Sequence, residues 1–593
     1  MNNIVSDLAS IQKIPATACA QADGSVFLMR ETGLHFESPQ DAKGNTKIIW
    51  LSGPFSISFS TRDFAGGDWG RVIEWKDGDG KLHVFTVSMS QLASSPSDVW
   101  SELASGGLAI SSSRQSRDLL ATYIQTLQVE KSARTVTKTG WAPGGRYVTS
   151  SGEVIGQDEN DIIFYRGDCA GKSVKGTDEE WKRSVAALAR GNSRLMLSIL
   201  AGFAAPLLSI CGEAGGGFHF RGSSSVGKTT ALKVAASVVG GEVKSWRATS
   251  NGLEGIATAH NDCVLLLDEI NQCSPLEVGE TAYMLANGIG KLRASRLGVA
   301  RQPAEWRTLF LSSGEQDLES ILSSVRKKTM AGMEIRMLSV PADAGAGLGI
   351  FEELHGRKTP GALAEDIAFA SAKFAGSAQK AWLEFLTDDI VREHVGSAIR
   401  KSIDLFSDSL LNDNDDGQVR RAARRFAVLW AAGNSTTELT GWTKSEVKNA
   451  IIKCFEAWKF NFQSDSNSGT KEESQIIDQA LSFLQMHSQT RFQSLSSDDL
   501  SQSFFIKDRV GFRRVNDATG EIEYIVFPDA FKKELVKGFD WRDASKTLVK
   551  AGIMKRFGRE FTKKESLPGL GRQRVYILSM SAISDDHISN DNF

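Results

Sequence analysis

The spacing of hydrophobic residues changes along the chain and divides it into four regions. Residues 1–175 carry short alternating runs such as Phe55–Ser60. The runs Val72–Trp75 and Leu82–Val87 flank Asp77–Gly80, which is typical of a β-hairpin. We therefore expect a β-rich N-terminal domain, with a helical patch near Arg117–Gln128.

A helical period replaces this alternation near residue 176. Thr177 and Glu180 have the spacing of a capping box, and they precede the helical runs Trp181–Ala189 and Ser193–Leu208. Continuous apolar runs then continue to about residue 345, as expected of parallel strands that are buried on both faces. This pattern predicts an α/β core over residues 176–345.

The last two regions differ from the core and from each other. Residues 346–470 are almost entirely helical in period and predict a helical lid, which ends at the polar stretch Gln463–Thr470. Residues 471–593 form a further predicted domain, whose acidic, polar end Ser584–Phe593 is expected to be disordered.

One segment of the core spells a complete phosphate-binding loop, G-x-x-x-x-G-K-[ST]. Phe218–Phe220 predicts a strand before it, and an amphipathic helix follows it until Gly240 and Gly241. Glycines let backbone N–H groups converge on phosphate, the lysine meets the β/γ-phosphates, and the threonine hydroxyl can bind Mg²⁺. The predicted ATP-binding residues are Gly222, Ser223, Ser224, Ser225, Val226, Gly227, Lys228, Thr229 and Thr230.

Two further predicted strands end in polar residues. The apolar run Cys263–Leu267 leads into Asp268 and Glu269, where ligands bind at the carboxyl edge of an open α/β sheet. Asp268 and Thr229 are predicted to hold Mg²⁺, and Glu269 to polarise the attacking water. The run Thr308–Leu311 places Ser313 at the same edge. Two acids beside a phosphate loop favour hydrolysis over binding alone.

Composition narrows the class of protein. At 593 residues the chain is long enough for several domains, and its net charge of −2 is near neutral. We find no membrane-spanning apolar run and no secretory signal, which together predict a cytoplasmic protein without a membrane partner. The six cysteines lack paired metal-ligand spacing and are expected to be reduced thiols.

Basic residues gather just before the third strand of the core. The segment Ala286–Arg301 carries four positive charges, three glycines and no acid. We interpret it as a flexible DNA-contacting loop, although a solvated surface loop remains an alternative. The candidate contacts are Lys291, Arg293, Arg296 and Arg301.

The last domain has the order of a winged helix. Phe531–Val536 and Ala544–Ala551 predict helices, whereas Ile553–Phe557 and Arg574–Leu578 predict strands around the Pro568–Gly571 loop. From residue 531 to 574 there are thirteen basic and five acidic residues, a surplus of eight that suits phosphate-backbone binding. The DNA-binding candidates here are Lys555, Arg556, Lys563 and Lys564, and a basic packing or interaction domain is the alternative.

These motifs together resemble the family called domain of unknown function 927, found in phage and mobile-element proteins. The resemblance runs from about Gly53 to Trp458 and, with the winged helix, extends to MCM-like replicative helicases of bacterial cassette elements. The blocks that carry it are Gly222–Thr229, Trp246–Asn251, Leu265–Glu269, Gly288–Arg293, Trp306–Arg307, Ser312–Glu315, Ala331–Arg336, Gly140–Trp141 and Gly417–Arg421.

The resemblance implies an AAA+ or superfamily 3-like core in a homo-hexameric, ATP-driven DNA helicase that starts replication of a mobile element. It also implies that the basic segment Ala286–Arg301 lies at the position of a pre-sensor hairpin that reaches into the ring channel. Single-stranded or forked DNA would lie in that channel and duplex DNA at the winged helix. Arg336 would act in trans as an arginine finger, with Arg326, Arg421 and Arg425 as competitors. Arg421, with Arg425, is assigned to the second-sensor role.

Two other functional classes stay open. The chain could be a nucleotide-switched, DNA-associated regulator or an anti-phage defence ATPase, in which hydrolysis resets a conformation without unwinding. A non-hydrolysing scaffold is a third reading, but the intact Lys228, Asp268 and Glu269 argue against it.

Overall fold

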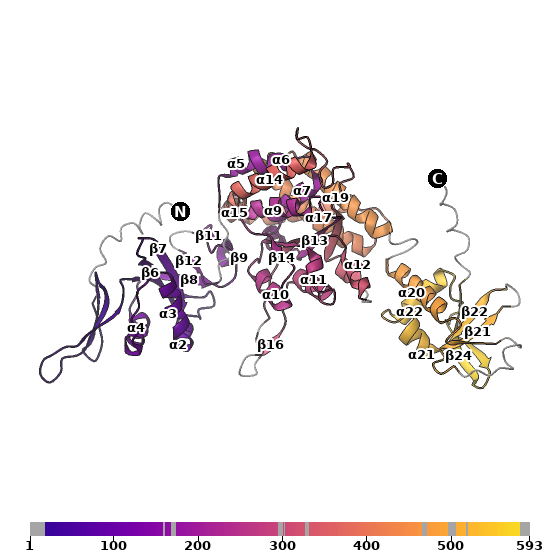
Figure 1. The fold of residues 1–593 in the computed structure, drawn as a ribbon, viewed down its shortest axis with the longest axis horizontal. Helices are drawn as coiled ribbons and strands as arrows, with labels where there is room; N and C mark the ends of the chain where they lie inside the picture. The colour runs from indigo at the N-terminus through magenta and orange to yellow at the C-terminus, as the bar shows by residue number, and fades with distance from the viewer. Residues whose placement is uncertain are drawn as a thin grey trace. The chain divides into compact units, whose positions relative to one another are not determined.

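The computed structural model describes residues 18–157, 161–167, 174–294, 300–301, 303–325, 331–464, 471–495, 506–516 and 520–580. The chain divides into two compact units, Met1–Ala457 and Trp458–Phe593. Figure 1 labels the helices and strands of both units. The predicted disordered tail, Ser584–Phe593, lies outside the described residues.

The N-terminal region is rich in strands, as its alternating pattern predicts. A four-stranded antiparallel sheet runs in the order β1-β2-β3-β4, and a five-stranded sheet in the order β12-β8-β5-β6-β7. A smaller sheet, β11-β10-β9, lies nearer to the core in sequence. The strands are β1 Ala18–Ala20, β2 Val26–Arg30, β3 Gly33–Glu37, β4 Ile48–Ser52, β5 Ser56–Arg62, β6 Gly70–Lys76, β7 Leu82–Ser88, β8 Ser132–Val136, β9 Gly140–Ala142, β10 Arg146–Val148, β11 Val154–Ile155 and β12 Ile163–Tyr165.

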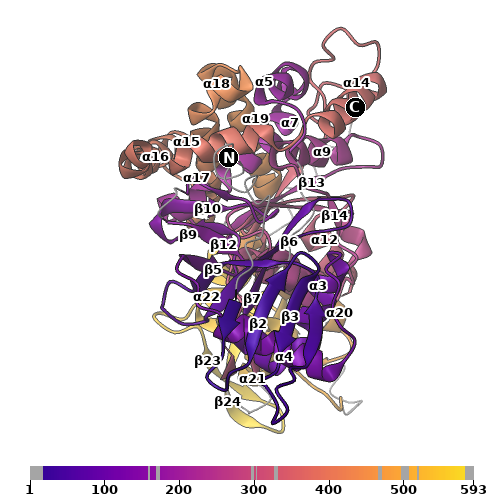
Figure 2. The ribbon, with the colours of Figure 1, turned by 90° about the vertical axis from the view of Figure 1, so that its left-hand side faces the viewer.

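Helices cover these N-terminal strands and close their core. The helices α2 Met89–Ser94, α3 Pro96–Ser105 and α4 Arg114–Thr126 lie against the strands in Figure 1, and Figure 2 shows α3 and α4 from another side. Their apolar faces pack on strand residues such as Phe27, Leu51 and Ile73, which are fully or almost fully buried. The helical patch expected near Arg117–Gln128 corresponds to α4.

The core of the first unit is a sheet of five parallel strands in the order β14-β15-β18-β13-β19. The strands are β13 Gly216–Arg221, β14 Lys244–Ser245, β15 Val264–Asp268, β18 Leu309–Gly314 and β19 Met337–Pro341. Because all five point the same way, their carboxyl ends meet at one edge of the sheet and their amino ends at the other.

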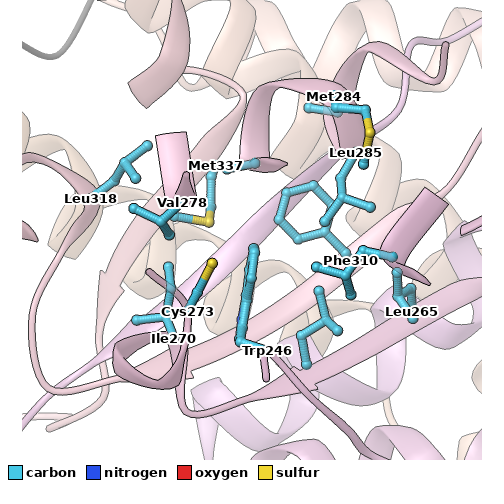
Figure 3. Packing of buried hydrophobic residues seen from close by; sticks show 14 of the residues in the cluster. Trp246, Leu265, Ile270, Cys273, Val278, Met284, Leu285, Phe310, Leu318 and Met337 are labelled. Atoms are coloured by element: carbon cyan, nitrogen blue, oxygen red, sulfur yellow. The ribbon is translucent and has the colours of Figure 1, made fainter. Parts of the chain in front are cut away.

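Both faces of this sheet are covered, which is why its strands read as continuous apolar runs. On one face, α10 to α12 enclose a cluster that includes Trp246, Leu265, Leu285 and Phe310 (Figure 3). The other face lies under α7, α9 and α17, where the Phe218 ring meets the Phe426 ring edge-on at 5.0 Å.

Helices from two stretches of sequence build this unit around the sheet. Thr177 and Glu180 form the predicted capping box. The first stretch holds α5 Asp178–Trp181, a π-helical turn Lys182–Ala186, α6 Ala187–Ala189, α7 Ser193–Ala204, α8 Leu207–Cys211, α9 Lys228–Val239, α10 Ser250–Thr258, α11 Val278–Asn287, α12 Leu318–Ser324 and α13 Ala331–Glu334. The second holds α14 Pro360–Lys373, α15 Ser377–Thr387, α16 Asp389–Ser409, α17 Gly417–Ser435, α18 Thr437–Thr440 and α19 Lys444–Ser464.

The second unit carries a five-stranded sheet in the order β20-β21-β22-β24-β23 together with short helices. Its elements are α20 Lys471–His487, β20 Phe492–Ser494, β21 Gly511–Val515, β22 Ile522–Val526, α21 Pro528–Ala530, a π-helical turn Phe531–Leu535, α22 Trp541–Lys550, β23 Lys563–Leu567 and β24 Gly571–Ser579.

The strand expected at Ile553–Phe557 is wrong. Ile553 and Met554 are buried in the apolar core under the helices, and Met554 makes a single bridge to Leu578. A tight turn from Phe557 to Glu560 then ends the extended path, and β23 is the strand that pairs with β24. Apolar composition alone could not separate a core-lining segment from a strand.

Candidate nucleotide-binding site

The phosphate loop lies between β13 and α9 at the carboxyl edge of the parallel sheet. Ser225 and Gly227 both take left-handed backbone conformations, with φ of 67° and 101°. A Cβ on Gly227 would lie 2.5 Å from Ile350 Cγ2, so glycine is required here by conformation and by space. The backbone N–H of Ile350 donates to the Val226 carbonyl at 2.9 Å and fixes the loop from outside.

Lys228 is the first residue of α9 and is buried. Its Nζ donates to the carbonyl oxygens of Gly222 and Ser223, at 2.7 Å each. The ammonium group therefore lies inside the loop, at the helix N-terminus, where an anion is favoured by the N–H groups and by the helix dipole.

Three further predicted residues meet at the same edge. Asp268 Oδ2 accepts a hydrogen bond from Thr229 Oγ1 at 3.3 Å, and its Oδ1 accepts one from Ser313 Oγ. The Ser313 hydroxyl in turn accepts from the Glu269 backbone N–H at 3.0 Å. Thr229, Asp268, Glu269 and Ser313, which come from three separate segments, thus form one connected cluster.

Glu269 has a left-handed backbone with φ of 60°, which is unusual for a residue with a side chain. Such strain persists where the surrounding structure imposes it, and the hydrogen bond to Ser313 contributes to that constraint. This conformation lies directly after the last residue of β15, Asp268.

The residues present fit a magnesium nucleotide. A threonine hydroxyl and a carboxylate are oxygen ligands of the kind that Mg²⁺ prefers, and a lysine and a helix N-terminus suit phosphate. Among the described residues, no group of three or more histidines, cysteines, aspartates and glutamates is placed to bind a metal by itself.

Sequence reasoning missed a buried histidine beside this cluster. His219 lies in β13 and is fully buried, with Nδ1 at 2.9 Å from Ser312 Oγ and Nε2 at 3.0 Å from the Gln316 carbonyl. Because a carbonyl can only accept, Nε2 carries the proton and Nδ1 accepts from the Ser312 hydroxyl. Ser312 also accepts from Trp246 Nε1 at 2.9 Å, so this network fixes β18 one residue before Ser313.

The network makes stability depend on pH. Burial lowers the pKa of His219 to about 4, below the ordinary value of 6.5. The folded protein therefore keeps His219 neutral, and this contribution is complete above pH 6.5 and is lost as the pH falls toward 4. Between mildly alkaline and mildly acidic buffer, we expect the thermal unfolding midpoint of His219→Gln to fall less than that of the wild type. Equal falls in both proteins would contradict this assignment.

Arg336 and Arg421 lie at the opposite edge of the sheet, away from their own phosphate loop. They line a cavity of about 800 Å³ at the amino ends of the strands, together with Arg307, Arg424 and Arg425. Arg336 Nε donates to Asn287 Oδ1 at 2.7 Å, and its guanidinium lies 4.5 Å from the centre of the Tyr283 ring. Neither residue can reach the phosphate loop of its own chain from this edge.

The other two lid arginines are bound into the fold. Arg425 is partly buried and donates to the carbonyls of Ile335 and Gly215, which precede β19 and β13. Burial lowers its pKa to about 10. Arg424 pairs with Glu213 and Asp404. Arg326, a further candidate, lies outside the described residues.

A hairpin of the N-terminal region contributes Trp141 to the lining of the same cavity. The Trp141 backbone N–H donates to Asp262 Oδ2 at 3.2 Å, and Tyr147 Oη donates to the Asp262 carbonyl at 2.8 Å. A Cβ on Gly140 would lie 2.6 Å from Asp262 Oδ2, so the hairpin requires glycine there. These contacts hold the start of β15, whose other end carries Asp268 and Glu269.

The basic segment before the third strand begins at this amino edge and forms a β-hairpin. Strand β16 Arg293–Ala294 pairs with β17 Ala300–Arg301, and Ile289 bridges to Glu305 below them. This strand pairing agrees with the hairpin position that the resemblance implies for the segment. Lys291 is exposed on the stem, and Arg296 lies outside the described residues.

The basic candidates of the second unit differ in their surroundings. Lys555 pairs with the buried Glu523, which also pairs with Arg514. Lys563 pairs with Glu565 beside it, whereas Arg556 and Lys564 are exposed. The Arg556 guanidinium lies 5.8 Å from the centre of the Phe561 ring.

Comparison with known proteins agrees with the predicted resemblance. Residues 27–305 match the family model "Domain of unknown function (DUF927)", which confirms the expected family. The match begins before the expected start at Gly53 and ends well before the expected end at Trp458. No curated protein sequence matches the chain. A solved structure titled "SCCmec type IV Cch - active helicase" is similar with a TM-score of 0.65 and 18% identity, covering 93% of this chain and 97% of that one. The chain therefore shares the fold of that helicase structure over nearly its whole length.

A second solved structure, the apo form of the "NrS-1 C terminal region", superposes with a TM-score of 0.22 and 11% identity, covering 68% of this chain and 91% of that one. In the part of the chain that the structure describes, no helix has the length and apolar character needed to cross a membrane.

Proposed function

We propose that this chain is an ATP-driven DNA helicase or translocase that hydrolyses ATP with Mg²⁺. The observation that carries the proposal is the convergence of the phosphate loop, Asp268, Glu269 and Ser313 at one edge of a parallel sheet. A nucleotide hydrolase needs these groups within reach of one another, and separate segments of the chain bring them there.

Each residue has a defined task in this proposal. Lys228 stabilises negative charge on the β/γ-phosphates, while Thr229 and Asp268 hold Mg²⁺, which neutralises charge that develops on the phosphate oxygens. Glu269 orients and polarises the attacking water. Ser313 contacts both acids through the Asp268 carboxylate and the Glu269 N–H, so it is a positioning residue for the pair.

Three observations support a DNA-acting AAA+ ring rather than an isolated ATPase. Strand β18 lies between β13 and β15, which places Ser313 between the phosphate loop and the acids. Arg336 and Arg421 lie at the far edge of the sheet, where they can serve a neighbouring subunit but not their own. The fold is shared with a structure whose title names an active helicase. We extend the proposal to a homo-hexamer that initiates replication of a phage or mobile element in the cytoplasm.

In this proposal the hairpin at residues 289–305 contacts the DNA backbone through Lys291, Arg293, Arg296 and Arg301. The Lys291→Ala/Arg293→Ala variant should keep basal ATPase and lose both DNA stimulation and strand displacement. Its DNA affinity should depend less on salt. The slope of the logarithm of affinity against the logarithm of salt concentration should fall by about one unit for each phosphate that the variant no longer neutralises. The exposed Lys401→Ala, on α16, is the matched control. An unchanged salt slope in the double variant would show that the hairpin is a solvated surface segment that does not contact DNA.

We further propose that the second unit is a winged-helix module that binds duplex DNA. Lys564→Ala should weaken duplex binding, most visibly at low salt, without changing the unfolding midpoint of this unit. Lys555→Ala should instead lower that midpoint, because Glu523 would lose one partner while staying buried.

Deleting the chain from about Gln463 should leave ATPase largely intact. If duplex affinity is lost neither in a lysine variant nor in the deletion, the second unit would be identified as a partner-docking unit.

The decisive experiment measures ATP hydrolysis and strand displacement with the same protein. We expect ATPase activity that DNA stimulates, together with displacement of one strand from a forked duplex. DNA-stimulated hydrolysis without displacement would instead favour the nucleotide-switched regulatory or defence ATPase.

A further inference from the structure

The loop between β5 and β6 exposes two large aromatic side chains close together in the sequence. Trp69 is 51% exposed and Phe64 is 37% exposed. Both belong to the turn that joins two strands of the five-stranded N-terminal sheet. Exposed aromatic rings lose the stabilisation that burial in a core would provide. Two such rings at one turn therefore indicate a binding surface.

An arginine accompanies each ring. The Arg62 guanidinium lies 5.7 Å from the centre of the Trp69 ring, and that of Arg134 lies 5.8 Å from the centre of the Phe64 ring. Arg62 and Arg134 are directly paired on the neighbouring strands β5 and β8. Two rings and two guanidinium groups therefore share one patch, which we call the Trp69–Phe64 patch.

The loop that carries this patch is held in place. The Asp63 N–H donates to the Gly67 carbonyl at 2.9 Å, and the Gly67 N–H donates to Asp63 Oδ1 at 2.7 Å. The Trp69 carbonyl accepts from the Met89 N–H at 2.8 Å, and Arg134 donates to the Asp63 carbonyl at 3.0 Å. A surface ordered before binding loses little conformational entropy when a ligand arrives.

The charges near the patch leave a positive excess. Three arginines, Arg62, Arg134 and Arg166, lie beside two acids, Asp63 and Asp68, and Arg166 forms an ion pair with Asp68. The aromatic rings are thus flanked by cations whose partners are rings and carbonyl groups. An anionic ligand with flat apolar groups would match both features.

We propose that the Trp69–Phe64 patch binds single-stranded DNA, with unpaired bases stacked on the two rings and phosphates beside Arg62 and Arg134. Every base offers a face for stacking, and arginine adds its charge to the same contact. Duplex DNA keeps its base faces covered and would bind here weakly. The choice of DNA as the nucleic acid rests on the proposed function.

Photocrosslinking of the full-length chain tests this site directly. Oligodeoxynucleotides that contain 5-iodouracil would be irradiated with the protein in the absence of ATP, and the attached peptides would be identified by mass spectrometry. We expect crosslinks at Trp69 or Phe64 with single-stranded oligonucleotides and much less with the same sequence as a duplex. Crosslinks confined to other regions of the chain would overturn the proposal.

Affinity measurements separate stacking from charge. Phe64→Ala/Trp69→Ala should weaken binding of a short oligothymidine by about tenfold or more, with basal ATPase and the salt slope unchanged. Arg62→Gln/Arg134→Gln should lower the salt slope. Trp50→Ala is the matched control, because Trp50 is 38% exposed but lies on β4 in the other sheet. Unchanged affinity in the aromatic variant, or an equal loss in the Trp50 control, would identify a protein-binding or purely structural surface.

The outcomes for this patch and for the proposed function can be told apart. The crosslinking and affinity measurements need neither ATP nor unwinding, so crosslinks at Trp69 support the patch even in a protein that displaces no strand. A chain that unwinds forked DNA and shows no crosslink at either ring would retain the proposed function and refute the patch.

Discussion

Glu269→Gln is expected to bind ATP with near wild-type affinity and to lose turnover by about 10²–10⁴-fold. The amide matches the carboxylate in shape but cannot polarise water as a base. The substitution leaves the Glu269 backbone N–H bonded to Ser313, so the left-handed end of β15 should be kept. Loss of chemistry without loss of binding is the signature of a group that acts on the attacking water.

Binding of a fluorescent ATP analogue and steady-state phosphate release measure the two effects separately. Lys228→Ala should lose binding itself, since it removes the charge inside the phosphate loop. Glu315→Gln is the matched control, because Glu315 is an exposed acid just beyond the end of the neighbouring strand β18. Hydrolysis by Glu269→Gln at near the wild-type rate would show that another group polarises the water.

The nucleotide site could be predicted from sequence because each of its parts is local. The phosphate loop needs only its own glycines, its lysine and the strand and helix on either side. Asp268, Glu269 and Ser313 were placed by a general rule, since strands in a parallel sheet end at the same edge. Their meeting in the structure follows from the strand order, with β18 between β13 and β15.

What the sequence could not predict depends on distant contacts. His219 looks like a stray polar residue in an apolar strand until Ser312 and Gln316 are brought beside it by β18 and the turn that follows. The buried path of Ile553–Met554 likewise depends on which segments pack against it. The spacing of hydrophobic residues predicts which positions are buried, but it does not identify the segments that bury them.

The functional roles of the lid arginines could not be separated from sequence either. Arg421 and Arg425 share a helix, and sequence assigns both to one sensor role. The guanidinium of Arg425 is hydrogen-bonded to the carbonyls of Gly215 and Ile335, whereas Arg421 is exposed in the cavity at the amino edge. Of the two, Arg421 is therefore the one that we propose as a sensor, and its nucleotide would belong to a neighbouring subunit.

Arg336→Ala is expected to lower ATP turnover by about 10³–10⁵-fold, as for an arginine finger supplied in trans. Arg336 directly precedes β19, which pairs in parallel with β13 from Gly217 and Met337 to Arg221 and Pro341. Strands rise about 3.3 Å per residue, so roughly 15 Å of sheet separates Arg336 from the phosphate loop of its own chain. If it contacts a γ-phosphate, that phosphate belongs to a neighbour.

Mixing two inactive variants tests this directly. Arg336→Ala and Lys228→Ala should each be inactive alone, yet a random equal mixture should regain up to about a quarter of the wild-type rate. In a ring of head-to-tail interfaces, about a quarter would join an intact phosphate loop to an intact Arg336. A mixture of Lys228→Ala with Glu269→Gln is the control, because both substitutions disable the site of their own chain and no interface is restored. If ATP turnover recovers in the first mixture and not in the control, Arg336 acts between subunits. If both mixtures stay inactive in rings shown to exchange subunits, Arg336 supports its own fold through Asn287 and Tyr283.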